Sequence, residues 1–290
     1  MRSIWVAVTA HRPLDRLNEL LKTLSHYDSF PYKVTVCIYI DYDSQDSLEF
    51  LEKAVSIFSN IDVQVKVASP GYEGWFLTWA HKTDLALEIL NKRHDLYIYQ
   101  ENDMELTLEN LKYWLTWKPR LSKLGLEPGF IRYEDCDGLR VPFDNHCVHS
   151  LVGETSDVWA EIGFTVPKVL VVDHEISVFV QAANPYYGAM ILNQVDGEQY
   201  IRSESYDPQK SYEKVGIRNW PIADRSSMGL AFEDLPAGYE HRRCVPLVRR
   251  DKKYVLTESS LIRHNDYKYA PELKRKGIEL MDYTELFALN

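Results

Sequence analysis

The sequence contains no hydrophobic run that approaches the roughly 18 apolar residues of a membrane span. The apolar stretch at residues 4–8 is also too short, and too soon followed by polar residues, for a signal peptide. Cysteine is scarce, and no C-x-x-C spacing occurs among Cys37, Cys136, Cys147 and Cys244. We therefore expect a soluble, cytoplasmic protein that begins at Met1, has no transmembrane segment and resides in a reducing compartment.

Basic residues are outnumbered by acidic ones. The 290 residues include 33 Lys and Arg against 43 Asp and Glu, which gives a net charge of −10. Such a chain would repel a polyphosphate backbone, so we expect no nucleic-acid partner. Apolar residues make up 45% and charged residues 26%, which excludes disorder and is typical of a globular protein with a sizeable core.

Several nucleotide and hydrolase motifs are also absent. The turn after the first expected strand reads Thr9-Ala10-His11-Arg12-Pro13 and has no glycine, so a dinucleotide-binding G-x-G-x-x-G loop is disfavoured. The chain has no P-loop, no G-x-S-x-G elbow and no kinase signature set. These absences argue against the corresponding enzyme classes.

The first 110 residues alternate strand and helix patterns. Strands are expected at residues 4–9, 34–40, 63–67 and 96–99. Helices are expected between them, the first opened by Pro13 with a Leu14, Leu17, Leu21 and Leu24 stripe, the second over 48–58, and the third striped by Phe76, Ala80, Leu87 and Leu90. This order predicts an α/β fold with a mostly parallel sheet flanked by helices, in which ligands bind beyond the carboxyl ends of the strands.

The second half is less regular. Residues 126–160 read as loop-rich, 169–172 and 176–180 as a hairpin, and 187–194 as a strand or short helix. Residues 203–228 show little periodicity, and the charged tail 272–289 is expected to be helical. With no repeat and no linker, we expect a single domain.

An acidic triplet, Glu101-Asn102-Asp103, directly follows the fourth expected strand. In extended geometry the two carboxylates, spaced i and i+2, would point the same way and repel each other unless a cation lay between them. Mg²⁺ or Mn²⁺ binds carboxylates together with substrate phosphate oxygens. The alternative is an exposed acidic turn that caps the helix expected at 107–117.

The first four expected strands are each followed by a distinctive segment: Thr-Ala-His-Arg-Pro, then Asp-x-Asp, then a Gly-rich turn, then the acidic triplet, with a helix after each of the first three. This order resembles the GT-A-fold glycosyltransferases of the family 2 type over about residues 3–110. The resemblance implies a Rossmann-like GT-A domain with a nucleotide-sugar half at 1–110 and an acceptor half with the tail at 111–290. It also implies a metal on Asp103, with Glu101 as the weaker ligand because the triplet reads E-N-D rather than D-x-D.

By the same resemblance, four residues after the first two strands would face the base and ribose of a nucleotide: Thr9, Arg12, Asp41 and Asp43. For the two aspartates the alternative is a helix N-cap, assisted by Ser44 and Asp46. Lys82, next to His81 on the third expected helix, would lie near the donor. A solvated helix face is the alternative for that pair.

A late segment around His264 would complete the donor site. Many GT-A enzymes supply a late histidine as a metal ligand, and imidazole suits Mn²⁺. Arg263 and Lys268 could then neutralise the leaving diphosphate. The alternative is a surface histidine. A competing zinc site would use a cluster whose spacing matches no common structural site: Cys136, His146, Cys147 and His149.

The acceptor side is expected in two segments. Tyr187 and Gly188 resemble a small-residue segment beside the acceptor, and otherwise form a simple turn. The pair Glu233-Asp234 resembles the family 2 motif whose aspartate is the catalytic base, although the usual Gln-x-x-Arg-Trp continuation is absent; the alternative is an acidic cap. Further acceptor candidates are Trp220, as an aromatic sugar platform, and Asp224.

Three functions remain open from the sequence. The first is a metal-dependent glycosyltransferase that moves a sugar from a nucleotide-diphosphate sugar, with UDP favoured, to a hydroxyl of a glycan or other acceptor, with inversion favoured. The second is a nucleotidyltransferase or other metal-dependent phosphoester enzyme, which usually has a glycine-rich basic loop where this chain has Thr9 to Pro13. The third is a carbohydrate-binding protein without catalysis.

Overall fold

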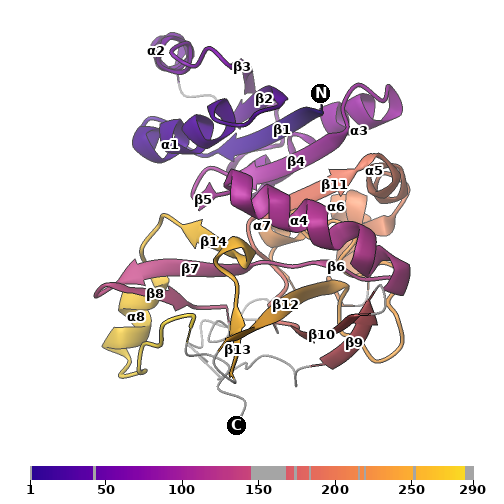
Figure 1. Ribbon diagram of the computed structural model, residues 1–290. Coiled ribbons are helices and arrows are strands. Elements are labelled where there is room, and N and C mark those ends of the chain that lie inside the picture. Colours follow the sequence, from indigo (N-terminus) through magenta and orange to yellow (C-terminus); the bar gives the residue numbers. More distant parts are fainter. Residues whose placement is uncertain are drawn as a thin grey trace. The chain divides into compact units, whose positions relative to one another are not determined.

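A computed structural model describes residues 2–41, 44–144, 168–172, 175–182, 184–214, 216–218, 220–250 and 253–284 (Figure 1). Its backbone divides into two compact units. The first comprises Met1–Leu108 and Gly188–Leu230, and the second comprises Glu109–Tyr187 and Ala231–Asn290. Within the described part of the chain, no helix combines the length and the apolarity needed to cross a bilayer.

The first unit is built on a five-stranded sheet of order β11-β4-β1-β2-β3. Strands β1, β2, β3 and β4 are parallel, and β11 runs antiparallel to β4 at one edge (Figure 1). These strands and the short β5 have the bounds β1 Ser3–Ala10, β2 Lys33–Ile40, β3 Ile61–Val67, β4 Leu96–Glu101, β5 Met104–Glu105 and β11 Ala189–Asn193. The predicted α/β class with a mostly parallel sheet is therefore confirmed.

Helices of the first unit cover this sheet. They are α1 Leu17–Asp28, α2 Gln45–Val55, α3 Lys82–Leu90, α5 Gln194–Tyr200, α6 Pro208–Glu213 and α7 Ile222–Ser226, with 3₁₀ turns η1 Gly74–Trp79 and η3 Glu204–Tyr206. One sheet face packs Trp5, Tyr97 and Met190 with Leu85 of α3 and Tyr200 of α5. Alternation along the strands sends their other side chains to the opposite face.

Helix α1 lies on that opposite face. Its Tyr27 hydroxyl donates to the Gln100 side chain of β4 at 2.5 Å. The helix begins at Leu17 rather than at the predicted Pro13, because Arg12 has a φ of +46° and Asp15 N–H donates to Arg12 O in a turn. An L-residue in the left-handed region does not continue into a helix.

The second unit is dominated by antiparallel strands. One sheet has the order β13-β12-β10-β9, and β6 pairs with β12. The predicted hairpin is confirmed as β9 and β10, with Val172 opposite Glu175. The bounds are β6 Glu127–Pro128, β9 Lys168–Val172, β10 Glu175–Val180, β12 Arg243–Arg250, β13 Lys253–Leu256, α4 Leu108–Leu121, η2 Ser122–Leu124 and η4 Glu258–Ser260.

A second sheet of this unit contains β14, β7 and β8 in neighbouring positions. Their bounds are β7 Ile131–Cys136, β8 Leu139–Pro142 and β14 Leu261–His264, and helix α8, Tyr269–Arg275, follows β14. The prediction of a helical tail over 272–289 is wrong for residues 276–284, and residues 285–289 lie outside the described residues. The helix ends at Arg275, and Gly277 with a φ of +76° follows it, the left-handed backbone at which helices commonly stop.

Candidate functional site

The candidate site of the first unit lies beside β1, where the order of the strands in the sheet reverses. β2 and β3 extend the sheet on one side of β1, and β4 lies on the other side. Thr9 of β1 pairs with Glu101 of β4, so both strands end at the same edge. In open parallel sheets, ligands bind beyond the carboxyl ends of the strands at this switch point.

A cavity of about 410 Å³ opens beyond the ends of β1 and β2. Arg12, Leu14, Asp41 and Ser47 are among the residues that line it. Arg12 N–H donates to Asp41 Oδ1 at 3.2 Å, and His11 Nδ1 lies 2.6 Å from Asp41 Oδ2. The structure thus brings two of the predicted nucleotide residues, Arg12 and Asp41, to one cavity of a size that suits a small polar ligand.

Other residues predicted to bind the nucleotide are placed differently. The Thr9 side chain is buried, and its hydroxyl lies 3.0 Å from the Tyr99 hydroxyl inside the unit. Ser44 is the N-cap of α2, and its hydroxyl accepts from Ser47 N–H. Asp43 lies outside the described residues.

Lys82 is an interior residue. Its ammonium donates to the Tyr200 hydroxyl at 2.5 Å and to Ser226 O at 2.6 Å, and it lies 5.0 Å from the centre of the Trp79 ring. Burial lowers the pKa of Lys82 well below its usual value. The neighbouring His81 is also fully buried and stacks on Tyr99 at 4.2 Å. The alternative of a solvated helix face is therefore wrong. Lys82 connects α3 to α5 and α7 inside the first unit.

The acidic triplet forms a turn rather than an extended segment. β4 ends at Glu101, Asn102 and Asp103 turn the chain, and β5 begins at Met104. Asn102 N–H donates to Thr9 O at 3.1 Å, which fixes the turn at the end of β1. A turn thus replaces the extended geometry that was assumed for the two carboxylates. Asp103 Oδ2 lies 3.6 Å from Arg16 Nη1, and its side chain is 16% exposed.

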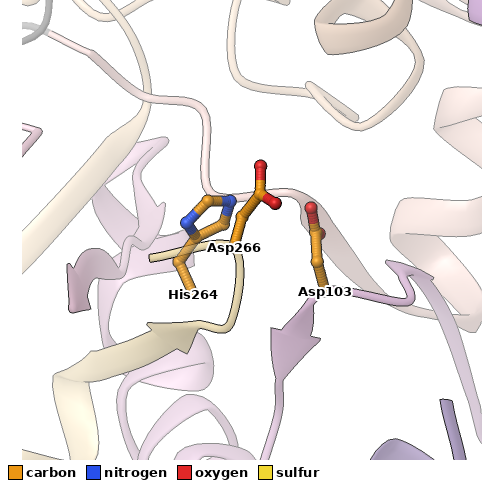
Figure 2. Close-up of side chains that lie close together, drawn as sticks. All are labelled: Asp103, His264 and Asp266. Atoms are coloured by element: carbon orange, nitrogen blue, oxygen red, sulfur yellow. The ribbon is translucent and has the colours of Figure 1, made fainter. Parts of the chain in front are cut away.

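His264 ends β14 in the second unit and is 2% exposed. Its Nδ1 lies 2.7 Å from Glu134 Oε1 of β7. Asp266, on the loop that follows, has a carboxylate oxygen within 4.8 Å of a His264 ring nitrogen. Figure 2 shows these two side chains, and it also labels Asp103 at the turn after β4. The burial of His264 excludes the alternative of a surface histidine. An imidazole beside a carboxylate is a ligand combination that suits Mn²⁺.

The predicted diphosphate-binding cations already have carboxylate partners in the second unit. Arg263 Nη2 lies 2.7 Å from Asp135 and donates to the Tyr267 hydroxyl at 2.6 Å. Lys268 Nζ lies 2.5 Å from Asp266. Either cation would have to exchange or share these partners to bind a phosphate.

On the predicted acceptor side, internal packing accounts for the small and aromatic residues. Gly188 has a φ of +61°, and a Cβ built there would lie 2.7 Å from Met104 Cγ. Its carbonyl accepts from Glu101 N–H at 2.9 Å. Tyr187 is 2% exposed, with its ring 5.1 Å from that of Phe130, so it has no open face for a sugar.

The remaining acceptor candidates belong to the first unit. Trp220 is half-buried just before α7, and its backbone N–H donates to Ile217 O at 3.0 Å. Asp224 lies in the first turn of α7 and is 8% exposed, so little of its side chain is available to an acceptor.

Of the two adjacent carboxylates predicted to include the catalytic base, one is buried and the other is exposed. Glu233 is 8% exposed, whereas Asp234 is exposed and has a φ of +46°. Aspartate is among the residues that tolerate this left-handed conformation. The two carboxylates thus differ in their exposure to solvent.

Sequence reasoning missed Glu134 and Asp266. Asp266 follows His264 by two residues, a His-x-Asp spacing that could have indicated it. Glu134 stands in the segment Tyr133-Glu134-Asp135, where nothing local distinguishes it from a strand residue facing solvent. For the competing zinc cluster, His146, Cys147 and His149 lie outside the described residues.

No family model and no curated protein matches the sequence. Three solved structures that resemble the chain are S. aureus TarS (12% identity, covering 46% of this chain and 21% of that one), TarS 1-349 (13%, 55% and 43%) and TarS 1-349 in complex with UDP-GlcNAc (16%, 50% and 38%), each with a TM-score of 0.30. The chain thus spans less than half the length of these structures, and a score this low carries no argument about fold or function.

Proposed function

We propose that the protein is a glycosyltransferase that moves a sugar from a nucleotide-diphosphate sugar, UDP being the favoured nucleotide, to a hydroxyl of a glycan or other acceptor. The observation that carries this proposal is the cavity beside the switch point of the first sheet. Arg12 and Asp41 line it, and Asp103 follows the neighbouring strand end. This is the edge at which α/β sheets bind nucleotides.

The cavity offers a complementary pair of groups to a nucleoside. The Asp41 carboxylate can accept hydrogen bonds from a ribose hydroxyl or a base N–H, and the Arg12 guanidinium can donate to a phosphate or carbonyl oxygen. Asp41 already accepts from Arg12 N–H and contacts His11, so its carboxylate is held at the cavity wall before a ligand arrives. Such preorganisation reduces the entropy lost on binding.

The same reaction would use Mn²⁺ or Mg²⁺. The proposed ligands are Asp103, Glu101 and His264, and Asp266 offers a further carboxylate. The donor set fits, because carboxylate oxygens and one imidazole suit Mn²⁺, and the Glu134 contact leaves His264 Nε2 as the basic nitrogen. When bound, such an ion supplies positive charge to the diphosphate as it leaves.

Asp234 is the proposed base. It would accept the proton of the acceptor hydroxyl, and its exposure allows contact with an acceptor from solvent. An inverting displacement requires this step. Arg263 and Lys268 remain proposed partners of the diphosphate.

The test is a titration with UDP, GDP and CMP, each with and without Mn²⁺, followed by calorimetry on Asp103→Ala. We expect UDP to bind more tightly with Mn²⁺, and the substitution to remove that gain, at least about tenfold in Kd or 1.4 kcal/mol. The Arg16 contact is partly exposed, so its loss should change stability by less than about 1 kcal/mol.

Asp62→Ala is the matched control, since Asp62 is an exposed carboxylate on β3 of the same sheet. It should leave the Mn²⁺-dependent gain unchanged. An Asp103→Ala protein that still binds UDP and Mn²⁺ like the wild type would overturn the metal assignment. Release of sugar from a UDP-sugar would separate a transferase from a binding protein, and release of pyrophosphate in sugar-nucleotide synthesis would indicate a nucleotidyltransferase.

A further inference from the structure

We propose that Glu134 is the positioning residue that orients His264 as a metal ligand through its Nε2 atom. This inference rests on the proposed function, because it assumes that His264 binds the metal. It assigns a role to a buried carboxylate that touches neither nucleotide nor sugar in the proposal. It also concerns contacts within the second unit only.

Glu134 is wholly buried, and three donors surround its carboxylate. His264 Nδ1 lies 2.7 Å from Oε1, Lys268 N–H donates to Oε1 at 3.2 Å, and Ala270 N–H donates to Oε2 at 2.8 Å. A buried carboxylate requires such partners to offset its lost hydration. The Glu134 side chain is therefore held in one position by the backbone that follows β14.

The pairing of β7 with β14 brings the two side chains together. The strands are parallel, and Arg263 pairs with Tyr133, so the next residues along are His264 and Glu134. The imidazole plane is restricted further by two rings, Phe143 at 5.5 Å and Tyr269 at 5.3 Å. His264 thus has little freedom to rotate away from Glu134.

This contact selects the tautomer. An ionised carboxylate only accepts hydrogen bonds, so Nδ1 must carry the proton that it donates. In the neutral ring the lone pair then lies on Nε2, which is the atom that can bind a metal. Histidine ligands commonly donate their second ring N–H to a carboxylate in this way, and loss of that carboxylate typically weakens metal affinity about 10–100-fold.

A purely structural role is the competing explanation. Glu134 could serve only to bind the backbone N–H groups of Lys268 and Ala270 at the start of α8. That role needs no histidine and predicts no effect on metal affinity once the protein is folded. The two explanations therefore differ in a binding measurement rather than in stability.

The experiment uses the full chain and measures Mn²⁺ affinity in the presence of UDP for the wild type, Glu134→Gln, His264→Ala and the double variant. We expect Glu134→Gln to raise the Kd for Mn²⁺ about 10–100-fold. In the double variant Glu134→Gln should add nothing to His264→Ala, since the carboxylate acts through the imidazole. Glu127→Gln is the control, because Glu127 is a buried glutamate of the same unit that pairs with Arg243.

The outcomes separate the two proposals. If His264→Ala binds Mn²⁺ like the wild type, the metal assignment fails and this inference fails with it. If His264→Ala loses affinity but Glu134→Gln and Glu127→Gln both keep it, only the positioning role is overturned. A loss in Glu134→Gln that adds fully to the loss in His264→Ala would also contradict it.

A measurement on the wild type covers the case in which Glu134→Gln does not fold. Long-range ¹⁵N–¹H NMR should show His264 with its proton on Nδ1, and added Zn²⁺, a diamagnetic ion that binds imidazole, should shift the Nε2 resonance. A proton on Nε2, or a Zn²⁺-dependent shift at Nδ1, would overturn the inference.

Discussion

Gly188 shows how a residue that suggests a ligand contact can be required by packing. Its φ of +61° lies in the left-handed region, and an added Cβ would lie 2.7 Å from Met104 Cγ and 2.8 Å from Met104 Cε. Both constraints arise inside the first unit. The glycine is therefore explained without a sugar.

We predict that Gly188→Ala lowers the free energy of unfolding by about 2–4 kcal/mol, from left-handed strain plus overpacking against Met104. Chemical denaturation of both proteins would measure this. Gly71→Ala is the control, since Gly71 also has a positive φ, of +97°, but nothing within 4 Å of its Cβ position. Equal losses for the two variants would show that the Met104 contact has no energetic effect.

Asp234 is the residue to which we assign the proton transfer from the acceptor hydroxyl. We predict that Asp234→Asn lowers sugar transfer by a factor on the order of 10²–10⁴, the usual contribution of a positioned base. Nucleotide and Mn²⁺ affinity should stay unchanged. Asparagine also tolerates the left-handed conformation that Asp234 adopts at a φ of +46°, so the backbone should be preserved. Calorimetry and a transfer assay run side by side would separate the two effects.

Glu233→Gln is the companion variant. Should Asp234→Asn transfer sugar at the wild-type rate while Glu233→Gln does not, the buried neighbour is the base. Activity in both variants would favour a retaining reaction, and proton NMR of the product anomer would identify it.

Among the elements, the inner strands were the easiest to predict. β1, β2 and β4 are runs of β-branched and aromatic residues that are buried almost throughout, so their apolar content alone identifies them. The polar residues after them were accordingly placed at the correct edge of the sheet. Their partners could not be predicted, because contacts such as Asp103 with Arg16 or His264 with Glu134 depend on tertiary structure.

The third predicted helix shows where periodicity misleads. Its expected stripe used Leu87 and Leu90, yet these side chains are 51% and 60% exposed. The buried residues of α3 are Lys82, Leu85 and Ile89. Two apolar stripes fit the same sequence, and only the packed sheet selects between them. The preceding segment forms the 3₁₀ turn η1 instead of helix, with Trp79 buried as Leu85 is.

β11 could not be assigned to the sheet from local pattern. It pairs antiparallel with β4, Ala189 opposite Gln100 and Asn193 opposite Leu96, across a long stretch of intervening chain. Of the strand or short helix expected at 187–194, the structure forms the strand, and α5 begins directly after it at Gln194. Pairing between such distant segments leaves no periodic signal in either one.

The chain passes between the two units three times. The first unit takes Met1–Leu108 and then Gly188–Leu230, whereas the second takes the segment between them and the C-terminal part. A cut at residue 110, where the two halves of the expected single domain meet, would therefore separate β4 from β11. It would also remove Met190, Leu192, Tyr200 and Leu230 from a core formed with Trp5 and Tyr97.

We predict that a fragment of residues 1–110 does not fold by itself, whereas residues 1–108 joined through a short flexible linker to 188–230 do. Four buried side chains that each contribute about 1.5–3 kcal/mol are lost from the shorter fragment. Their sum, on the order of 6–12 kcal/mol, is comparable to the whole stability of a domain. The fragment would also expose β4 as a sheet edge, which favours aggregation.

Circular dichroism during thermal unfolding and amide hydrogen exchange would compare the two fragments. The joined fragment should unfold cooperatively and protect the β4 amides, and the 1–110 fragment should do neither. If the 1–110 fragment is folded and binds UDP, β11 and α5 contribute less to the nucleotide half than their burial indicates. If neither fragment folds, the first unit depends on the second for stability, and the Asp41 cavity must be studied in the full chain.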